Sequence, residues 1–248
     1  MIIQIKKEIY EKLSDSEKSV VDYINQNEKK IPLLSITNIA EKTFTSTATV
    51  SRAIQKCGFQ GISELRYMIS QQDKDNSEDN SPFLVNEILA KSYRESAQTI
   101  DNLRVTSILQ AIDFIKKAKR IYLYSRGFTA LIAEDFQMCL QVLGYDAIVV
   151  SDVIWMNNTN KIIKPDDIVF ILSIRNSTKE LAESARAAQR TGAKVITCCC
   201  KSPTDLEKYS DIVITGHSEQ IMDINGLNVY SRIPLLIITR TIIEYLSI

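Results

Sequence analysis

Five short apolar runs, separated by helical stretches, constrain the second half of this chain more than any other feature. The runs lie at residues 120–125, 147–151, 167–173, 194–198 and 211–215. Strands that read as continuous apolar runs and alternate with helices form a parallel sheet that is covered on both faces. The sequence therefore predicts a three-layer α/β domain around a five-stranded parallel sheet.

The first half has a different period and indicates two short helices with a tight break between them. Within residues 37–58, Val50, Ala53 and Ile54 recur at helical spacing. Ser46 stands where a side-chain oxygen caps a helix, and Gly58 stands where a helix ends with positive φ. We interpret this segment as a helix-turn-helix within a small all-α domain.

The face of the second helix opposite its buried residues is small and polar, with a long cation. A major groove admits such a helix, whose N-terminal side chains then reach base edges and phosphates. The motif alone leaves open an ordinary helical hairpin with a solvated polar face. The candidate DNA-binding residues are Ser46, Thr47, Ala48, Thr49, Ser51, Arg52, Gln55 and Lys56.

A polar stretch separates the two halves. Residues 71–81 contain no apolar side chain and are followed by Pro82. Such a stretch cannot bury enough surface to offset the entropy lost on ordering it. We therefore expect a helix-turn-helix domain at 1–70, a linker at 71–82 and the α/β domain at 83–248.

Two loops that follow predicted strands carry groups suited to an anion. In parallel sheets of this kind, ligands bind beyond the carboxyl ends of the strands. The loops at 125–129 and 173–178 each combine hydroxyls, an arginine and the start of a helix, whose positive end favours an anion. The alternative is that these hydroxyls only cap their helices. The candidate ligand-binding residues are Ser125, Arg126, Gly127, Thr129, Ser173, Arg175, Asn176, Ser177 and Thr178.

Composition and charge exclude several classes of protein. The formal net charge is zero, so a nucleic-acid partner must be recognised by a local surface. No apolar segment approaches the length of a membrane helix. Five cysteines without a CxxC pair, and one histidine, argue for reduced thiols in a cytoplasmic protein that has no metal site. Nothing indicates a cofactor, and Cys198–Cys200 are expected to pack at a strand end.

Motifs in both halves resemble one family. In the first half they lie at 13–24, 35–41, 48–52 and 58–65, and in the second at 133–135, 143–144, 150–152, 178–180, 192–195 and 230–232. In these motifs the chain resembles the RpiR family of bacterial transcriptional regulators. That family joins an N-terminal helix-turn-helix to a C-terminal SIS (sugar isomerase) domain that senses phosphosugars.

The resemblance implies a function for each domain. The second helix of the motif would be the recognition helix on double-stranded DNA, and the SIS domain would form homodimers or homotetramers. A symmetric dimer would read a palindromic operator. A sugar phosphate effector would contact Ser173 and Thr178, together with Gly127 and Thr129.

The chain departs from the family at both sites. Phe44 stands where the turn of the motif usually has a glycine, and Thr45 stands where it has an apolar residue. In the second SIS loop, Arg175 replaces a serine and Asn176 replaces a glycine. A degenerate SIS module that only dimerises the DNA-binding domain therefore remains an alternative.

An enzyme is the third hypothesis. Isomerisation of a phosphosugar requires a base near C1 and C2 of the sugar, usually a glutamate or histidine. The available residues are Glu134, Glu180 and His217. Glutamates on helices are most often solvated or capping, so we expect a regulator and not an enzyme.

Overall fold

The computed structural model describes residues 7–73, 81–175, 178–203 and 205–248. The chain divides into two compact units, Met1–Arg94 and Glu95–Ile248. Helix α6 (Ser81–Asn102) contributes residues to both units. Most of the expected linker at 71–82 falls on residues 74–80, which lie outside the described part.

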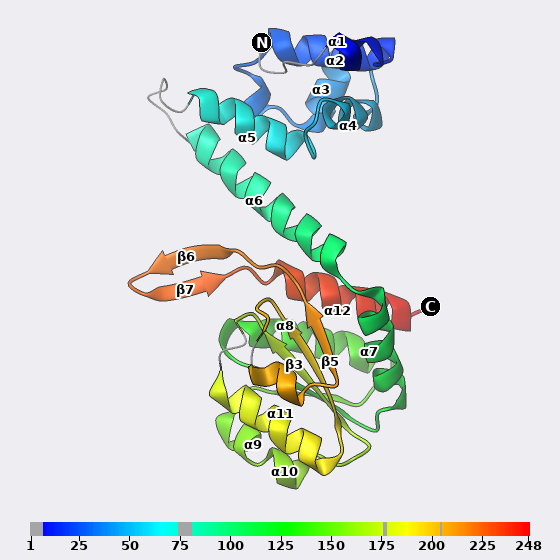
Figure 1. Cartoon of the computed structure of the whole chain (residues 1–248), viewed down its shortest axis with the longest axis vertical. Helices are drawn as coiled ribbons and strands as arrows, with labels where there is room; N and C mark the ends of the chain where they lie inside the picture. The colour runs from blue at the N-terminus through cyan, green and yellow to red at the C-terminus, as the bar shows by residue number, and fades with distance from the viewer. Residues whose placement is uncertain (1–6, 74–80, 176–177, 204) are drawn as a thin grey trace. The chain divides into compact units, whose positions relative to one another are not determined.

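The first unit is entirely helical in its described residues (Figure 1). Its elements before α6 are α1 (Lys7–Glu11), α2 (Asp15–Gln26), the 3-10 turn η1 (Ile31–Leu33), α3 (Ile36–Lys42), α4 (Thr47–Lys56) and α5 (Ile62–Asp73). Capping boxes start α2 and α3: Ser14 pairs with Glu17, and Ser35 with Asn38. The core that holds these helices together includes Val20, Ile24, Ile39, Val50, Ile54 and Leu65.

The second unit is built on the predicted five-stranded parallel sheet. The strands are β1 (Ile121–Ser125), β2 (Ala147–Val150), β3 (Ile168–Ser173), β4 (Lys194–Cys199) and β5 (Ile212–Thr215), in the order β2-β1-β3-β4-β5. All four neighbouring pairs are parallel. The predicted fold class is thereby confirmed.

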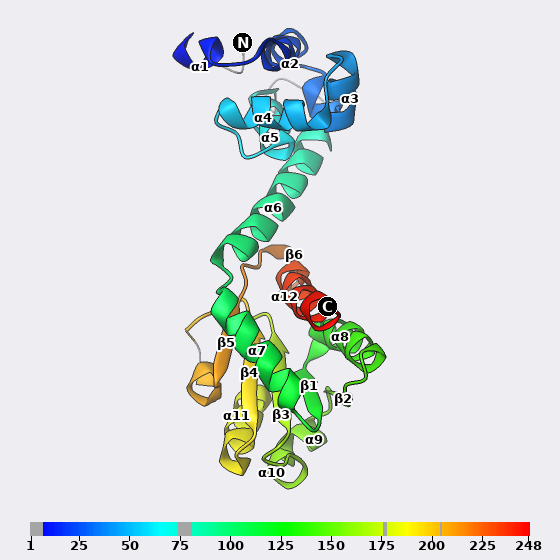
Figure 2. The same cartoon turned by 90° about the vertical axis from the view of Figure 1, so that its right-hand side faces the viewer.

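Helices cover both faces of the sheet (Figure 2). One layer is α7 (Val105–Lys117), α8 (Ala130–Val142) and α12 (Ile233–Leu246); the other is α9 (Val153–Asn157), α10 (Thr159–Ile162), α11 (Lys179–Thr191) and the 3-10 helix η3 (Asp205–Tyr209). Alternate strand residues supply the two cores: Leu123 and Phe170 face the first layer, whereas Tyr122 and Tyr124 face the second. Both layers bury apolar side chains, which explains why the strands read as unbroken apolar runs.

A hairpin after β5 was not predicted. Strands β6 (Gln220–Ile224) and β7 (Leu227–Tyr230) pair antiparallel and form a separate two-stranded sheet. Asn225 and Gly226 both have positive φ, 52° and 84°, as a two-residue type I′ turn requires. Among the described residues, no helix is both long enough and apolar enough to cross a membrane.

Candidate functional site

The helix-turn-helix forms as the sequence predicts, from α3, a short turn and α4. Ser46 is the N-cap of α4, and its Oγ accepts a hydrogen bond from the Thr49 amide at 3.1 Å. Gly58, just after α4, has a φ of 94°. The buried side of α4 is Val50, Ala53 and Ile54, so the opposite face is free to meet a partner.

The predicted DNA-binding residues divide by what they contact. Thr47, Ala48, Arg52 and Gln55 are exposed, whereas Thr49 and Ser51 are half-buried. An Arg52 Nη donates to Thr49 Oγ1 at 3.4 Å, and Thr49 Oγ1 lies 2.9 Å from Ser46 Oγ. Lys56 Nζ donates to Glu17 Oε2 at 2.7 Å and so ties α4 to α2.

Glu17 is a buried carboxylate at the base of this motif. Only 4% of the residue is exposed. Its carboxylate accepts hydrogen bonds from Lys56 Nζ and from the Ser14 amide, which together hold the pKa of Glu17 below its ordinary value. The pair links α2 to the last turn of α4.

Phe44, in the turn between α3 and α4, has an unusual backbone conformation. It has a φ of 53° although it is not a glycine, and 97% of the residue is exposed. The Thr45 amide, next along the chain, donates to the Ala40 carbonyl at 2.9 Å, so the turn closes despite the bulky residue. A left-handed backbone is unfavourable for a residue with a Cβ, and the exposed ring gains little packing in return.

A cavity of about 190 Å³ opens at the carboxyl ends of β1 and β3 in the second unit. It brings both predicted loops together, as the topology requires. It is lined by Arg126, Phe128, Thr129, Leu172, Ser173, Ile174, Arg175, Thr178, Leu181, Asn228, Val229, Tyr230 and Arg232. Asn176 and Ser177, which were also predicted, lie outside the described residues.

The loop after β1 presents polar groups that have few partners. Ser125 is fully buried, and its Oγ has no hydrogen-bond partner among the described residues. Arg126 Nη1 donates to the Ser151 carbonyl at 2.7 Å. Gly127 has a φ of 56°, and an added Cβ would meet no atom within 4 Å. Thr129 is the N-cap of α8, yet its side chain makes no capping hydrogen bond.

The loop after β3 brings two more of the predicted hydroxyls to the cavity. Ser173 is 7% exposed at the end of the strand. Thr178 is the N-cap of α11, and its side chain also makes no capping bond. The interpretation that these hydroxyls serve only as helix caps is therefore wrong for Thr129 and Thr178. The Ala130 amide at the start of α8 already donates to the Gly127 carbonyl, because a 3-10 turn, Gly127–Thr129, leads directly into that helix. The start of α11 is therefore the helix end better suited to an anion beside the cavity.

Sequence reasoning missed the hairpin side of the cavity. Tyr230 and Arg232 come from the end of β7 and the start of α12, and Phe128 comes from the first loop. The Arg175 guanidinium lies over the Tyr230 ring at 5.4 Å, and that of Arg232 lies over Phe128 at 5.5 Å. The Asn225-Gly226 pair was a signal for this hairpin that the sequence offered.

The residues considered for catalysis do not gather at this cavity. Its described lining contains no aspartate, glutamate or histidine. Glu134 is exposed on α8, Glu180 lies in the first turn of α11, and His217 lines a different cavity. Within the described parts of the chain, no group of acidic, histidine or cysteine residues is arranged to hold a metal ion.

The cysteine triplet packs at the end of β4, as expected. Burial raises the pKa of the Cys198 thiol well above its ordinary value, and it raises that of Cys199 to about 11. The Cys200 thiol is shifted in the same direction by the same cause. Protonated thiols are poor nucleophiles, so this cluster is not suited to thiolate chemistry at neutral pH.

Comparison with known proteins decides the family. Residues 1–76 match the helix-turn-helix domain of the rpiR family, and residues 114–242 match the SIS domain. The chain belongs to the RpiR family. It is 26% identical over 234 residues to an uncharacterized HTH-type transcriptional regulator of Clostridium perfringens, covering 90% of this chain and 84% of that protein. It is 26% identical over 212 residues to the uncharacterized HTH-type transcriptional regulator YfhH of Escherichia coli, covering 80% of this chain and 75% of that protein.

Solved structures share the fold of this RpiR-family chain. The Vibrio vulnificus NanR protein complexed with ManNAc-6P aligns with a TM-score of 0.58 and 21% identity, over 95% of this chain and 87% of that one. The sugar isomerase domain of an RpiR transcription factor from Sphaerobacter thermophilus aligns with a TM-score of 0.60 and 15% identity, over 65% and 88%. The chain is thus an RpiR-type helix-turn-helix transcriptional regulator with a SIS domain.

Proposed function

We propose that this regulator binds a palindromic operator as a homodimer through the exposed face of α4, and that its SIS domain senses a sugar phosphate. The DNA contacts would come from the exposed residues of α4, above all Arg52 and Gln55. One recognition helix binds weakly, and a symmetric pair doubles the contacts. Lys56 would act on DNA only where its contact with Glu17 is shared or broken.

The cavity between the two loops is the observation that carries the ligand proposal. Helix α11 begins beside it with no capping bond from the Thr178 side chain, and the buried Ser125 hydroxyl next to it lacks a partner among the described residues. Buried polar groups without partners are rare in folded proteins. Arg126, Arg175 and Arg232 line the same cavity and supply the positive charge that a phosphate requires.

A relative's ligand agrees with this chemistry. NanR, which shares the fold, is complexed with a phosphorylated sugar. The cavity's hydroxyls and arginines suit the phosphate, and Asn228 and Tyr230 from the hairpin offer polar groups to the sugar. The arginine at position 175 and the asparagine at 176 distinguish this chain from its family and are expected to select the particular sugar phosphate.

The exposed apolar face of α8 supports a homodimer through the SIS domain. Leu131, Met138 and Val142 recur on one side of this helix and are 60%, 60% and 87% exposed. Exposed apolar patches of this kind mark interaction surfaces. We propose that a second copy of the chain covers them in a homodimer, with a homotetramer as the larger alternative.

We propose a sensor and not an isomerase because the cavity has no candidate base in its described lining. Proton transfer between C1 and C2 requires such a base within hydrogen-bond reach. The other two readings make different predictions: an isomerase would turn over its ligand, and a degenerate module would bind none.

A thermal-shift screen against a panel of sugar phosphates, with inorganic phosphate as control, tests the proposal. At about a hundred times its dissociation constant, a specific ligand adds roughly 2.7 kcal/mol to the free energy of unfolding. Thr178→Val, which keeps the side-chain shape, should abolish the rise in melting temperature that the ligand causes. Thr241→Val, an exposed threonine on α12, is the matched control and should keep it.

The alternatives give distinct results. If no sugar phosphate raises the melting temperature of protein that still binds its operator, the SIS domain is a dimerisation module. Conversion of the ligand by the purified protein would show an isomerase instead. Sedimentation of wild type and Met138→Glu at the same concentration tests the dimer, and an unchanged mass would exclude the α8 face as its interface.

A further inference from the structure

The second unit has another cavity, larger than the first. Its volume is about 700 Å³, and it lies at the carboxyl ends of β4 and β5, on the other side of β3 from β1. Pockets of 300–1,000 Å³ are typical of small-molecule sites. None of its lining residues is shared with the first cavity; they come from the α6–α7 junction, the loop after β4 and the end of β5.

Unpaired positive charge lines this cavity. Arg104 precedes α7 and Lys201 follows β4, and neither side chain forms an ion pair with any described residue. The hydroxyls of Ser107 and Ser202 add further donors, and His217 also lines the cavity, with its Nε2 at 3.4 Å from Glu219 Oε1. Glu207 is the one acidic residue in the described lining. Two cations against one carboxylate leave this lining with an excess of positive charge, which favours an anion.

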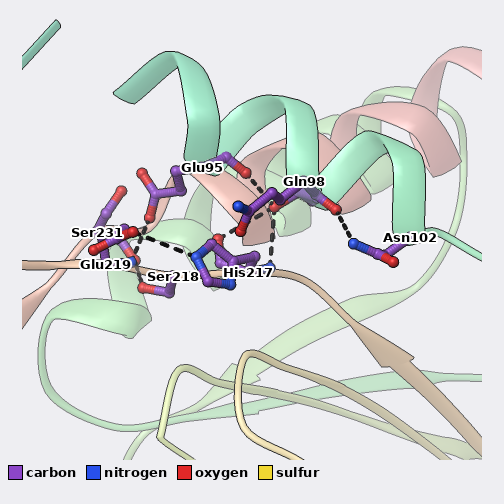
Figure 3. A network of polar contacts seen from close by, with 8 residues as sticks. Glu95, Gln98, Asn102, His217, Ser218, Glu219 and Ser231 are labelled. Atoms are coloured by element: carbon purple, nitrogen blue, oxygen red, sulfur yellow. Dashed lines mark hydrogen bonds and ion pairs between the residues drawn. The ribbon is translucent and has the colours of Figure 1, made fainter. Parts of the chain in front are cut away.

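The wall of this cavity is fixed to the last turns of α6 (Figure 3). The His217 amide donates to Thr99 Oγ1 at 3.0 Å, and the Thr99 hydroxyl lies 3.2 Å from the His217 carbonyl. The Glu219 amide donates to Glu95 Oε1 at 2.9 Å. Thr99 and Glu95 are 0% and 2% exposed, so these bonds are shielded from water.

The same segment also leads to the first cavity. The Ser218 hydroxyl donates to the Ser231 carbonyl at 2.8 Å, and Ser231 lies between Tyr230 and Arg232 of that cavity. Residues 217–219 therefore join the end of α6 to both cavities. The last turns of α6, from Glu95 on, belong to the second unit, whereas its earlier turns belong to the first.

We propose that the cavity at β4 and β5 is a second effector site, which binds a phosphorylated small molecule through Arg104 and Lys201 and rigidifies the end of α6. The phosphate would bridge the two cations, and the remaining volume would hold the rest of the molecule. Binding there is independent of the sugar phosphate site, whereas its regulatory consequence rests on the proposed function.

Titration calorimetry of the full chain with pyrophosphate, and with inorganic phosphate, tests the site. We expect saturable binding that R104A/K201A weakens at least tenfold. The matched control, K161A/R190A, removes one lysine and one arginine that also lack ion pairs among the described residues and lie outside both cavities. The control should bind as wild type does. Glu207→Gln, which removes the acidic charge, should tighten binding.

The outcomes separate this site from the first one. If R104A/K201A binds pyrophosphate as wild type does, or if Thr178→Val loses binding instead, the second site is wrong and the sugar phosphate proposal is untouched. Absence of saturable binding to either anion would also overturn it. Hydrogen exchange of residues 95–102 should slow when the anion binds, and unchanged exchange in the bound protein would refute the effect on α6.

Discussion

The two candidate surfaces of this regulator are assembled from the chain in different ways. The recognition face belongs to one continuous segment, Ser46 to Lys56, and its exposed residues follow from the period of a single helix. The ligand cavity takes residues from the loops after β1 and β3 and from the end of β7. The first surface is a local property of the sequence, whereas the second exists only because the sheet order places β1 beside β3.

Their cations differ in the same way. Arg52 reaches back to Thr49 on its own helix. Arg175 and Arg232 lie over aromatic rings from other parts of the second unit, Tyr230 and Phe128. A guanidinium held against a ring loses less freedom when a ligand binds. The cavity is thus better preorganised than the recognition face, which is expected to adjust on DNA.

The largest expected effect separates the two units. Phe170 is fully buried in the sheet and contacts Phe136 edge to face at 5.2 Å between ring centroids. Phe170→Ala should lower the free energy of unfolding of the second unit by about 3–5 kcal/mol. Calorimetry should show that transition moving while the transition of the first unit stays. A single transition that moves as a whole would show that the units unfold together.

The next largest effect is expected on operator binding alone. Arg52→Ala should weaken operator binding by about 1–3 kcal/mol if Arg52 reads a guanine. Anisotropy with labelled operator measures this, and Lys29→Ala, which removes an exposed charge elsewhere in the first unit, is the control. Sugar phosphate binding should not change in either variant. Equal losses in both variants would indicate that only net charge matters.

The sequence predicts the parts of this fold that have a strong period. The five strands were predictable because both faces of the sheet are buried, which leaves continuous apolar runs such as 168–172. The hairpin was missed because four of the five residues in β6, 221–224, are exposed and show no clear alternation. The short helices α9 and α10 have too few turns to show a helical period.

The candidate sites follow the same division. The loops after β1 and β3 could be named because parallel strands place their ends at one edge. Tyr230 and Arg232 could not be named from the sequence, because only the hairpin brings them to the cavity. The Lys56–Glu17 pair spans 39 residues of sequence, and no local pattern specifies it. Sequence reasoning therefore counted Lys56 as free for DNA, although its ammonium already has a partner.

That pair allows a smaller test that involves pH. Glu17→Gln keeps the capping box but loses the charge opposite Lys56, so it should destabilise the first unit by about 1 kcal/mol at pH 7. Folding lowers the pKa of Glu17 from its ordinary 4.5. The stability that the charged Glu17 contributes to the wild type is therefore present above pH 4.5 and is lost as the pH falls through the lowered pKa. Urea unfolding at pH 7 and pH 4 should show the two proteins converging. A difference that does not change with pH would mean that packing, and not charge, is responsible.

The smallest expected effect concerns the turn between α3 and α4. At a φ of 53°, Phe44 adopts a backbone that is unfavourable for L-residues by roughly 1–2 kcal/mol, whereas glycine adopts it freely. Glycine also raises the conformational entropy of the unfolded chain, which favours unfolding by roughly 0.4–1 kcal/mol. The two effects partly cancel, so Phe44→Gly should stabilise the first unit by only about 0.5 kcal/mol. Phe44→Ala removes the exposed ring but keeps a Cβ, and it should leave stability nearly unchanged. Urea unfolding of both variants distinguishes the backbone from the ring: if alanine stabilises as much as glycine does, the ring and not the positive φ is the source of the strain.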